Sequence, residues 1–177
     1  MAKESTRHLV LAALFLALGL LLPFLTAQVP ALGARLLPMH IPVLLCGFVL
    51  GGPWGFAVGL ITPVLRSFLL GMPPMFPTAV AMAFELAAYG FLTGLVYKRT
   101  GSVYPSLILA MLGGRIVWGV VSFVLYGLSG SSFGWQAFIA GAFVNALPGI
   151  IFQLIAIPLI VLALQRAGLV SSQTRGA

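Results

Sequence analysis

Residues 78–97, TAVAMAFELAAYGFLTGLVY, form the stretch that decides the fold. This run contains a single charged residue, Glu85, and the whole chain has only two acidic residues. A helix needs about 20 mostly apolar residues to cross the hydrocarbon core of a bilayer. The stretch therefore predicts a membrane-spanning helix that carries an ionisable group inside the apolar region.

The composition extends this interpretation to the whole chain. Of its 177 residues, 61% are hydrophobic and 6% are charged, and the mean hydropathy is +1.16. Soluble domains carry about 25% charged residues, so most of this protein's surface must be matched by lipid. We expect one all-α integral membrane domain over residues 1–177, because the length leaves no room for a separate soluble module.

Pro- and Gly-rich breaks divide the chain into six apolar runs, which predict six transmembrane helices. The predicted spans are 7–25, 41–51 (or from His40), 54–70, 78–97, 104–126 and 135–164. The second and third are short for a membrane crossing. Pro148 and Pro158 are expected to kink the last one. The first run is longer than the roughly 7–15 residues of a signal-peptide core, which favours an uncleaved helix.

The basic residues predict the topology. With six spans both termini share one side of the membrane, and most Lys and Arg residues fall there, as the positive-inside rule requires of a cytoplasmic side. These residues are Lys3, Arg7, Lys98, Arg99, Arg166 and Arg175. We therefore expect cytoplasmic N- and C-termini. The net charge of +7 does not predict nucleic-acid binding, because the charges lie singly between apolar runs.

Three ionisable residues, Arg66, Glu85 and Arg115, lie within the predicted spans. A charge at the bilayer centre costs about 2.5–3.5 kcal/mol on insertion scales, so it normally faces a partner or a wet cavity. At about 1.5 Å per residue, Glu85 lies roughly 12 Å below the outer end of its helix. The depth of these three residues predicts a polar pocket open to the outside. Two Arg residues and one Glu give that pocket a net positive charge, which favours a small anionic or carboxylate-bearing ligand. Alternatively, Glu85 and Arg115 form a structural ion pair and Arg66 snorkels to the interface.

Three further residues are candidates for the same pocket, and each has a structural alternative. Asn145 reaches a depth similar to that of Glu85 but could instead make an interhelical hydrogen bond. Trp118 lies one turn from Arg115 on the same helix face, too deep for an interfacial aromatic belt. His40 could bind ligand or cap the second helix.

The sequence does not predict an enzyme or a cofactor. It holds no Ser-His-acid set, no paired acids and no Gly-rich phosphate loop after a strand. His8 and His40 are far apart and Cys46 is the only cysteine, so no metal site is predicted. Without a Walker motif, energy for any transport must come from another protein.

Taken together, four stretches resemble the substrate-binding S-component of an energy-coupling-factor (ECF) vitamin transporter. They are the Ala13/Ala17 spacing in the first helix, LPMHIPVLLCGFVLGGPWGFAVGLITPVLRS (37–67), GMPPMFPTAVAMAFELAAYGFLTGLVYK (71–98) and GGRIVWGVV (113–121). Within that group the sequence is most similar to the pantothenate-type members. The resemblance implies a six-helix, multi-pass protein of a prokaryotic cell membrane that binds a vitamin near its outer face.

The resemblance also implies partners and roles. S-components dock on a transmembrane T-subunit that carries two cytoplasmic ATPases, through a surface that corresponds here to Ala13 and Ala17. Two loops that gate the ligand correspond to about Gln28–His40 and Gly71–Pro77. Ligand contacts from the fourth to sixth helices correspond to the residues Glu85, Arg115, Trp118 and Asn145.

Pantothenate is the favoured ligand, with folate or riboflavin as alternatives. Pantothenate carries a carboxylate, hydroxyls and an amide. Our hypothesis is that Arg115 or Arg66 holds the carboxylate, while Glu85 and Asn145 hydrogen-bond the hydroxyl–amide part.

Two other function classes remain open from the sequence. One is a small structural or assembly membrane protein in which Glu85 and Arg115 form an internal staple. The other is a stand-alone secondary transporter, although residues 1–88 and 89–177 show no convincing internal repeat.

Overall fold

The structure is a computed structural model that describes residues 2–27, 36–128, 130 and 134–170. In this part of the chain every regular element is a helix. The α-helices are α1 (Ala2–Ala27), α3 (His40–Leu50), α4 (Gly52–Leu70), α5 (Val80–Thr100), α6 (Val103–Leu128), α7 (Trp135–Ile139) and α8 (Leu147–Arg166). Two short π-helices, η1 (Met75–Ala79) and η2 (Ala140–Val144), precede α5 and α8.

The predicted all-α membrane architecture is confirmed. Five segments are long and apolar enough to cross a membrane, namely Ser5–Phe24, Gly52–Leu70, Met75–Thr100, Val103–Leu128 and Trp135–Arg166. The remaining apolar helix, α3, has 11 residues. At about 1.5 Å per residue it measures about 16 Å, roughly half of a hydrocarbon core of about 30 Å. One end of α3 must therefore lie near the middle of the bilayer.

The last predicted helix is not continuous. After α7 the chain widens into η2, turns at Asn145 and Ala146, and resumes as α8 with Pro148 in its first turn. Proline suits a first turn because its missing N–H has no partner there in any case. At the kink expected near Pro148 the regular α-helix is interrupted, although Asn145 and Ala146 keep right-handed helical backbone angles, whereas α8 continues through Pro158.

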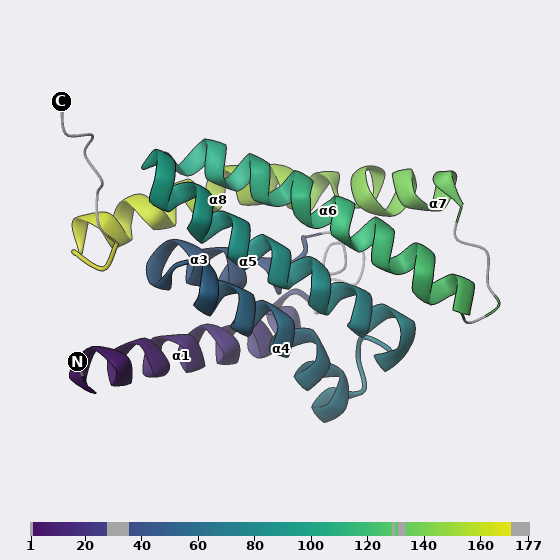
Figure 1. Ribbon diagram of the computed structural model, residues 1–177, viewed down its shortest axis with the longest axis horizontal. Helices are drawn as coiled ribbons and strands as arrows, with labels where there is room; N and C mark the ends of the chain where they lie inside the picture. Colours follow the sequence, from purple (N-terminus) through teal and green to yellow (C-terminus); the bar gives the residue numbers. More distant parts are fainter. Residues whose placement is uncertain (1, 28–35, 129, 131–133, 171–177) are drawn as a thin grey trace.

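The centre of the bundle is α5, which packs against α3, α4 and α6 (Figure 1). Glycines make the contact with α4 unusually close. A Cβ on Gly55 would lie 2.5 Å from the carbonyl oxygen of Gly90, and one on Gly90 would meet the Gly55 backbone. Gly59 and Gly94 extend this seam toward either side. The four-residue spacings Gly55–Gly59 and Gly90–Gly94 therefore serve internal packing.

The other helices flank this centre. α1 packs on α3 and α4 through Ala12 and Phe15, both buried, while α8 makes sparser contacts with α3 and α6. The start of α1 and the end of α8 lie at the same end of the bundle (Figure 1). We call this the basic end, because Lys98, Arg99 and Arg166 occupy the last turns of α5 and α8. The positive-inside rule predicts that it faces the cytoplasm.

Candidate functional site

A cluster of buried charged side chains lies in the middle of the bundle. Glu85 from α5 is 2% exposed, Arg115 from α6 is 5% exposed, and His40, the first residue of α3, is 1% exposed. The Arg115 Nη1 atom lies 2.9 Å from Glu85 Oε1, and His40 Nε2 lies 3.5 Å from the same oxygen. The predicted pairing of Glu85 with Arg115 is confirmed as a contact, and His40 joins it.

The local sequence explains why these three side chains meet. Gly114 lets α6 approach α5 closely, because a Cβ there would lie 2.9 Å from the Tyr89 ring and 3.2 Å from the Glu85 carbonyl oxygen. Tyr89 follows Glu85 by one turn, interacts with the Arg115 side chain, and packs edge-on against His40 at 5.1 Å between ring centroids. One small residue on α6 and one aromatic residue on α5 therefore fix the cluster.

The cluster lies near the middle of the membrane. At about 1.5 Å per residue, Glu85 and Arg115 lie about 22 Å and 18 Å from the basic ends of their helices, and His40 lies about 15 Å from the end of α3. The chain enters α3 from residues Leu36–Met39, of which Met39 is 5% exposed. The described end of the first loop thus lies at the depth of the buried charges.

Gln153 is a buried polar residue that the sequence analysis missed. It lies on α8, is 1% exposed, and its Nε2 donates to the carbonyl oxygen of Leu37 at 3.4 Å. Counted from Arg166 it lies about 20 Å from the basic end, level with the cluster. Its signal in the sequence was a single amide inside the apolar run IIFQLIAIPLI (150–160). Gln153 links α8 to the described end of the first loop.

Several buried polar atoms of the cluster have no hydrogen-bond partner. They are Nε and Nη2 of Arg115 and both ring nitrogens of His40. Glu85 Oε1 lies in ion-pair contact with Arg115 and 3.5 Å from the His40 ring, but both contacts lack hydrogen-bond geometry. A buried donor without an acceptor costs about 1–3 kcal/mol, and more when it is charged. The cluster is therefore electrostatically paired but still offers unfilled hydrogen-bonding capacity.

Arg66 does not join this cluster. It is partly buried near the outer end of α4, where its Nη1 donates to the carbonyl oxygen of Met72 at 2.8 Å. Its guanidinium also lies 5.3 Å from the ring centre of Phe24 on α1. Arg66 thus ties the connector Gly71–Pro77 to the bundle, a role that neither sequence interpretation foresaw.

Asn145 and Trp118 are also placed apart from the buried charges. Asn145 has an exposed side chain in the turn before α8. Trp118 is partly buried and stacks on Phe138 of α7 with 6.3 Å between centroids. A Cβ on Gly141 would lie 2.6 Å from the Trp118 ring, so Trp118 fills the space between α6 and η2.

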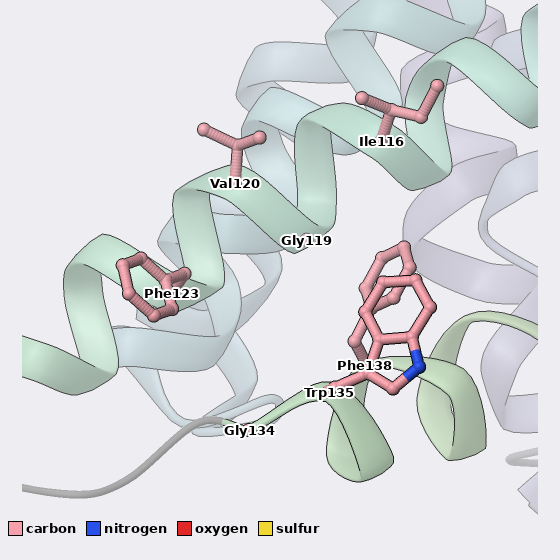
Figure 2. Close-up of a pocket in the computed structure, with 7 residues that line it drawn as sticks. All are labelled: Ile116, Gly119, Val120, Phe123, Gly134, Trp135 and Phe138. Carbon is pink, nitrogen blue, oxygen red and sulfur yellow. The ribbon is translucent and has the colours of Figure 1, made fainter.

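A groove of about 630 Å³ lies between α6 and α7 (Figure 2). Its lining is formed by Ile116, Gly119, Val120, Phe123, Gly134, Trp135 and Phe138. Figure 2 shows Trp135 and Phe138 side by side beneath α6, with the side chains of Ile116, Val120 and Phe123 above them. No charged residue lines the groove and several of its side chains are exposed. The groove therefore suits acyl chains of the bilayer rather than a small charged solute.

Ala13 and Ala17, expected to form a docking surface, are exposed on α1. They lie on the face opposite to Ala12 and Phe15, which contact the bundle. Exposed neighbours Val10, Leu14 and Leu21 extend the same face. Of the two expected gating loops, residues 28–35 lie outside the described part of the chain, whereas the connector Gly71–Pro77 is described.

Comparison with known proteins gives one finding. The family model described as "ECF transporter, substrate-specific component" matches residues 7–161. No curated protein and no solved structure matches the chain significantly. The match includes every residue of the buried cluster and the exposed face of α1. Among the described residues, no group of three His, Cys, Asp or Glu side chains could hold a metal ion.

Proposed function

Since this chain belongs to the ECF transporter substrate-specific component family, we propose that it captures a small water-soluble vitamin and that the His40–Glu85–Arg115 cluster contacts that vitamin. The family is one of membrane transporter subunits that supply substrate specificity, and it implies association with a T-subunit and ATPases. The proposal adds the class of ligand and the place where it binds.

The observation that carries the proposal is the buried cluster itself. Three ionisable side chains, each at most 5% exposed, converge from α3, α5 and α6 at mid-membrane depth. Intramembrane charges are costly and normally face a partner, a substrate pathway or a wet cavity. A purely structural staple would need only Arg115 beside Glu85. Here His40 also lies 3.5 Å from the Glu85 carboxylate, and polar atoms of Arg115 and His40 have no hydrogen-bond partner.

Pantothenate fits the chemistry of the cluster best among the vitamins that we considered. Its carboxylate could be held by Arg115, and its hydroxyl and amide groups could donate to and accept from Glu85, Tyr89 and Gln153. Arg66 is the weaker candidate for the carboxylate, because its Nη1 already donates to Met72. Asn145 is likewise weaker, because its side chain is exposed.

The test is calorimetric titration of the purified, detergent-solubilised protein with a panel of water-soluble vitamins, beginning with pantothenate. We expect tight one-to-one binding of one vitamin. Replacing Glu85 and Arg115 together by Gln and Met, which removes both charges, should abolish this binding while the protein remains folded. If a folded wild-type sample bound no vitamin, Glu85 and Arg115 would be better explained as an internal ion pair.

The coupling half of the proposal concerns the face of α1 that bears Ala13 and Ala17. Small residues let another helix approach closely in a membrane, and the described structure leaves this face uncovered. Replacing both alanines by Trp should abolish vitamin uptake by cells that contain the coupling module, while vitamin binding by the purified subunit stays unchanged. Uptake at the wild-type rate would overturn the assignment of this face.

A further inference from the structure

The strongest unexplained feature of the structure is a buried edge of the Arg115 guanidinium whose donors have no hydrogen-bond partner. Nη1 contacts Glu85, whereas Nε and Nη2, which share the opposite edge, have no hydrogen-bond partner although Arg115 is 5% exposed. That edge presents two parallel N–H donors, the geometry that binds a carboxylate through both oxygens. Buried donors of this kind are rarely left unfilled.

The charge of the site restricts what can fill this edge. Arg115 and Glu85 together are neutral, so a bound carboxylate would leave one uncompensated negative charge among buried groups. Such a charge is strongly unfavourable in a low-dielectric environment. His40 lies 3.5 Å from the Glu85 carboxylate, and its Nδ1 atom is also buried without a partner. A proton on His40 would restore neutrality.

We propose that the Nε–Nη2 edge of Arg115 is a binding site for the carboxylate of the ligand, and that His40 takes up one proton when this site is filled. The proposal rests on the proposed function and deepens it. It restricts the ligand to a monoanion with a planar oxyanion group, such as pantothenate, nicotinate or biotin, and excludes riboflavin, thiamine and pyridoxine.

Few other titratable groups in the cluster could take up the proton instead of His40. Those that face His40 are Glu85 and Tyr89 from α5 and Arg115 from α6. On α8, the buried polar residue at the level of the cluster is Gln153, which does not titrate. The titratable side chains described on α1 and α8 lie toward the basic end; they are Arg7, His8 and Arg166. The titratable side chain on α4, Arg66, lies toward the opposite end. A guanidinium and a phenol have no site for a further proton, and a proton on Glu85 would remove its ion pair with Arg115. We therefore assign the proton to His40.

The first experiment compares matched ligands that differ in the carboxylate alone. Pantothenate is titrated against its alcohol analogue pantothenol, and nicotinate against nicotinamide, by calorimetry. The acid of at least one pair should bind at least about 100-fold more tightly than its neutral partner, because two charge-assisted hydrogen bonds and an ionic contact are lost. Equal binding of a neutral partner, or tight binding of riboflavin or thiamine alone, would overturn this inference and leave the vitamin-binding function intact. If no vitamin bound at all, both would fail.

The second experiment measures the proton. Titrations of the acid that binds in buffers of different ionisation enthalpy should give an uptake of about one proton per ligand, and affinity should be at least about tenfold higher at pH 6 than at pH 8. His40→Gln should abolish both effects while binding persists. Zero uptake in the wild-type protein, or unchanged uptake in His40→Gln, would refute the role of His40.

The variant Arg115→Lys separates charge from geometry. Lysine keeps the ion pair with Glu85 but lacks the two-donor edge, so the protein should fold and its affinity for the acid should fall about 10- to 100-fold. Gln165→Leu is the matched control, since it removes a 2.7 Å hydrogen bond to Tyr97 at the basic end of the same bundle. It should bind the acid normally. Unchanged affinity in Arg115→Lys would contradict binding through the edge.

Discussion

The α4–α5 contact and the α6–α7 contact both place glycine where two helices meet, but with opposite results. Between α4 and α5, Gly55 and Gly90 bring two backbones together with no room for a Cβ on either residue. Between α6 and α7, Gly119 instead receives the aromatic ring of Phe138, and a groove of about 630 Å³ remains beside it. A close backbone seam leaves two helices no room to shift, whereas the α6–α7 contact is made by side chains beside a groove.

This difference assigns separate tasks to the two sides of the bundle. Glu85 and Tyr89 lie on α5, so the rigid seam holds the acidic part of the cluster in place. Gln153 lies on α8, whose contacts with α3 and α6 are sparse. We infer that ligand entry disturbs the α7–α8 side first and leaves the α4–α5 side unchanged.

The largest effect is expected from a side chain placed in the backbone seam. Gly90→Val should destabilise the protein by about 3 kcal/mol or prevent folding, because α4 and α5 must separate to admit the new atoms. Thermal unfolding in detergent measures the change. Gly127→Ala is the matched control: no atom lies within 4 Å of its Cβ position, and stability should change by less than about 0.5 kcal/mol. A stable Gly90→Val protein would show that the seam is not rigid.

A smaller effect is expected at the link between α8 and the end of the first loop. Gln153→Leu removes the hydrogen bond to the Leu37 carbonyl, worth about 1 kcal/mol. If that bond helps to close the site, the bound ligand should dissociate about fivefold faster, while the free energy of unfolding falls by no more than about 1 kcal/mol. Stopped-flow displacement of a bound ligand measures the rate. A slower rate, or a loss of stability without a change in rate, would contradict a closing role for Gln153.

The smallest effect is expected in the groove. Phe138→Ala removes a stacked contact with Trp118 and a tilted ring contact with Trp135; such aromatic pairs are worth about 0.5–1.5 kcal/mol in buried settings. Because lipid or detergent can fill the vacated space, we expect a loss of about 1 kcal/mol or less and unchanged ligand affinity. Thermal unfolding and calorimetry on one preparation test both points. A tenfold loss of affinity would move the ligand site toward the groove.

Hydropathy predicted the helices well but not how each of them faces its neighbours. The apolar runs around Glu85 and Arg115 have the length of a membrane crossing, so their depth, and hence their pairing, could be predicted. The exposure of Asn145 could not, because the π-helical segment and the break before Leu147 rotate the chain at that point. The rotation of a helix about its axis depends on its packing against other helices, which cannot be predicted from the sequence of that helix alone.

The same reasoning explains why the surroundings of His40, Gln153 and Arg66 could not be predicted from the sequence. His40 was expected either at a ligand or as a cap near the interface, and its placement at mid-depth follows from the shortness of α3, which only the fold reveals. Gln153 is a single uncharged amide in an apolar run, which is a weak signal of a functional site. Arg66 donates a hydrogen bond to a backbone carbonyl in a loop, and such a partner cannot be predicted from the types of the side chains.

The shortness of α3 has a consequence for how the protein is made. An 11-residue helix cannot cross the bilayer by itself, and in the finished fold eight of its residues, His40 and Pro42–Phe48, are buried by other helices. The helix that covers much of it, α5, is synthesised about 40 residues later. While the chain is being inserted, among the described helices only α1 and α4, the latter joined to α3 at Gly51, are therefore present to cover α3 until α5 arrives. Biogenesis of this protein thus passes through a stage in which His40 is already in the membrane and Glu85 has not yet reached it.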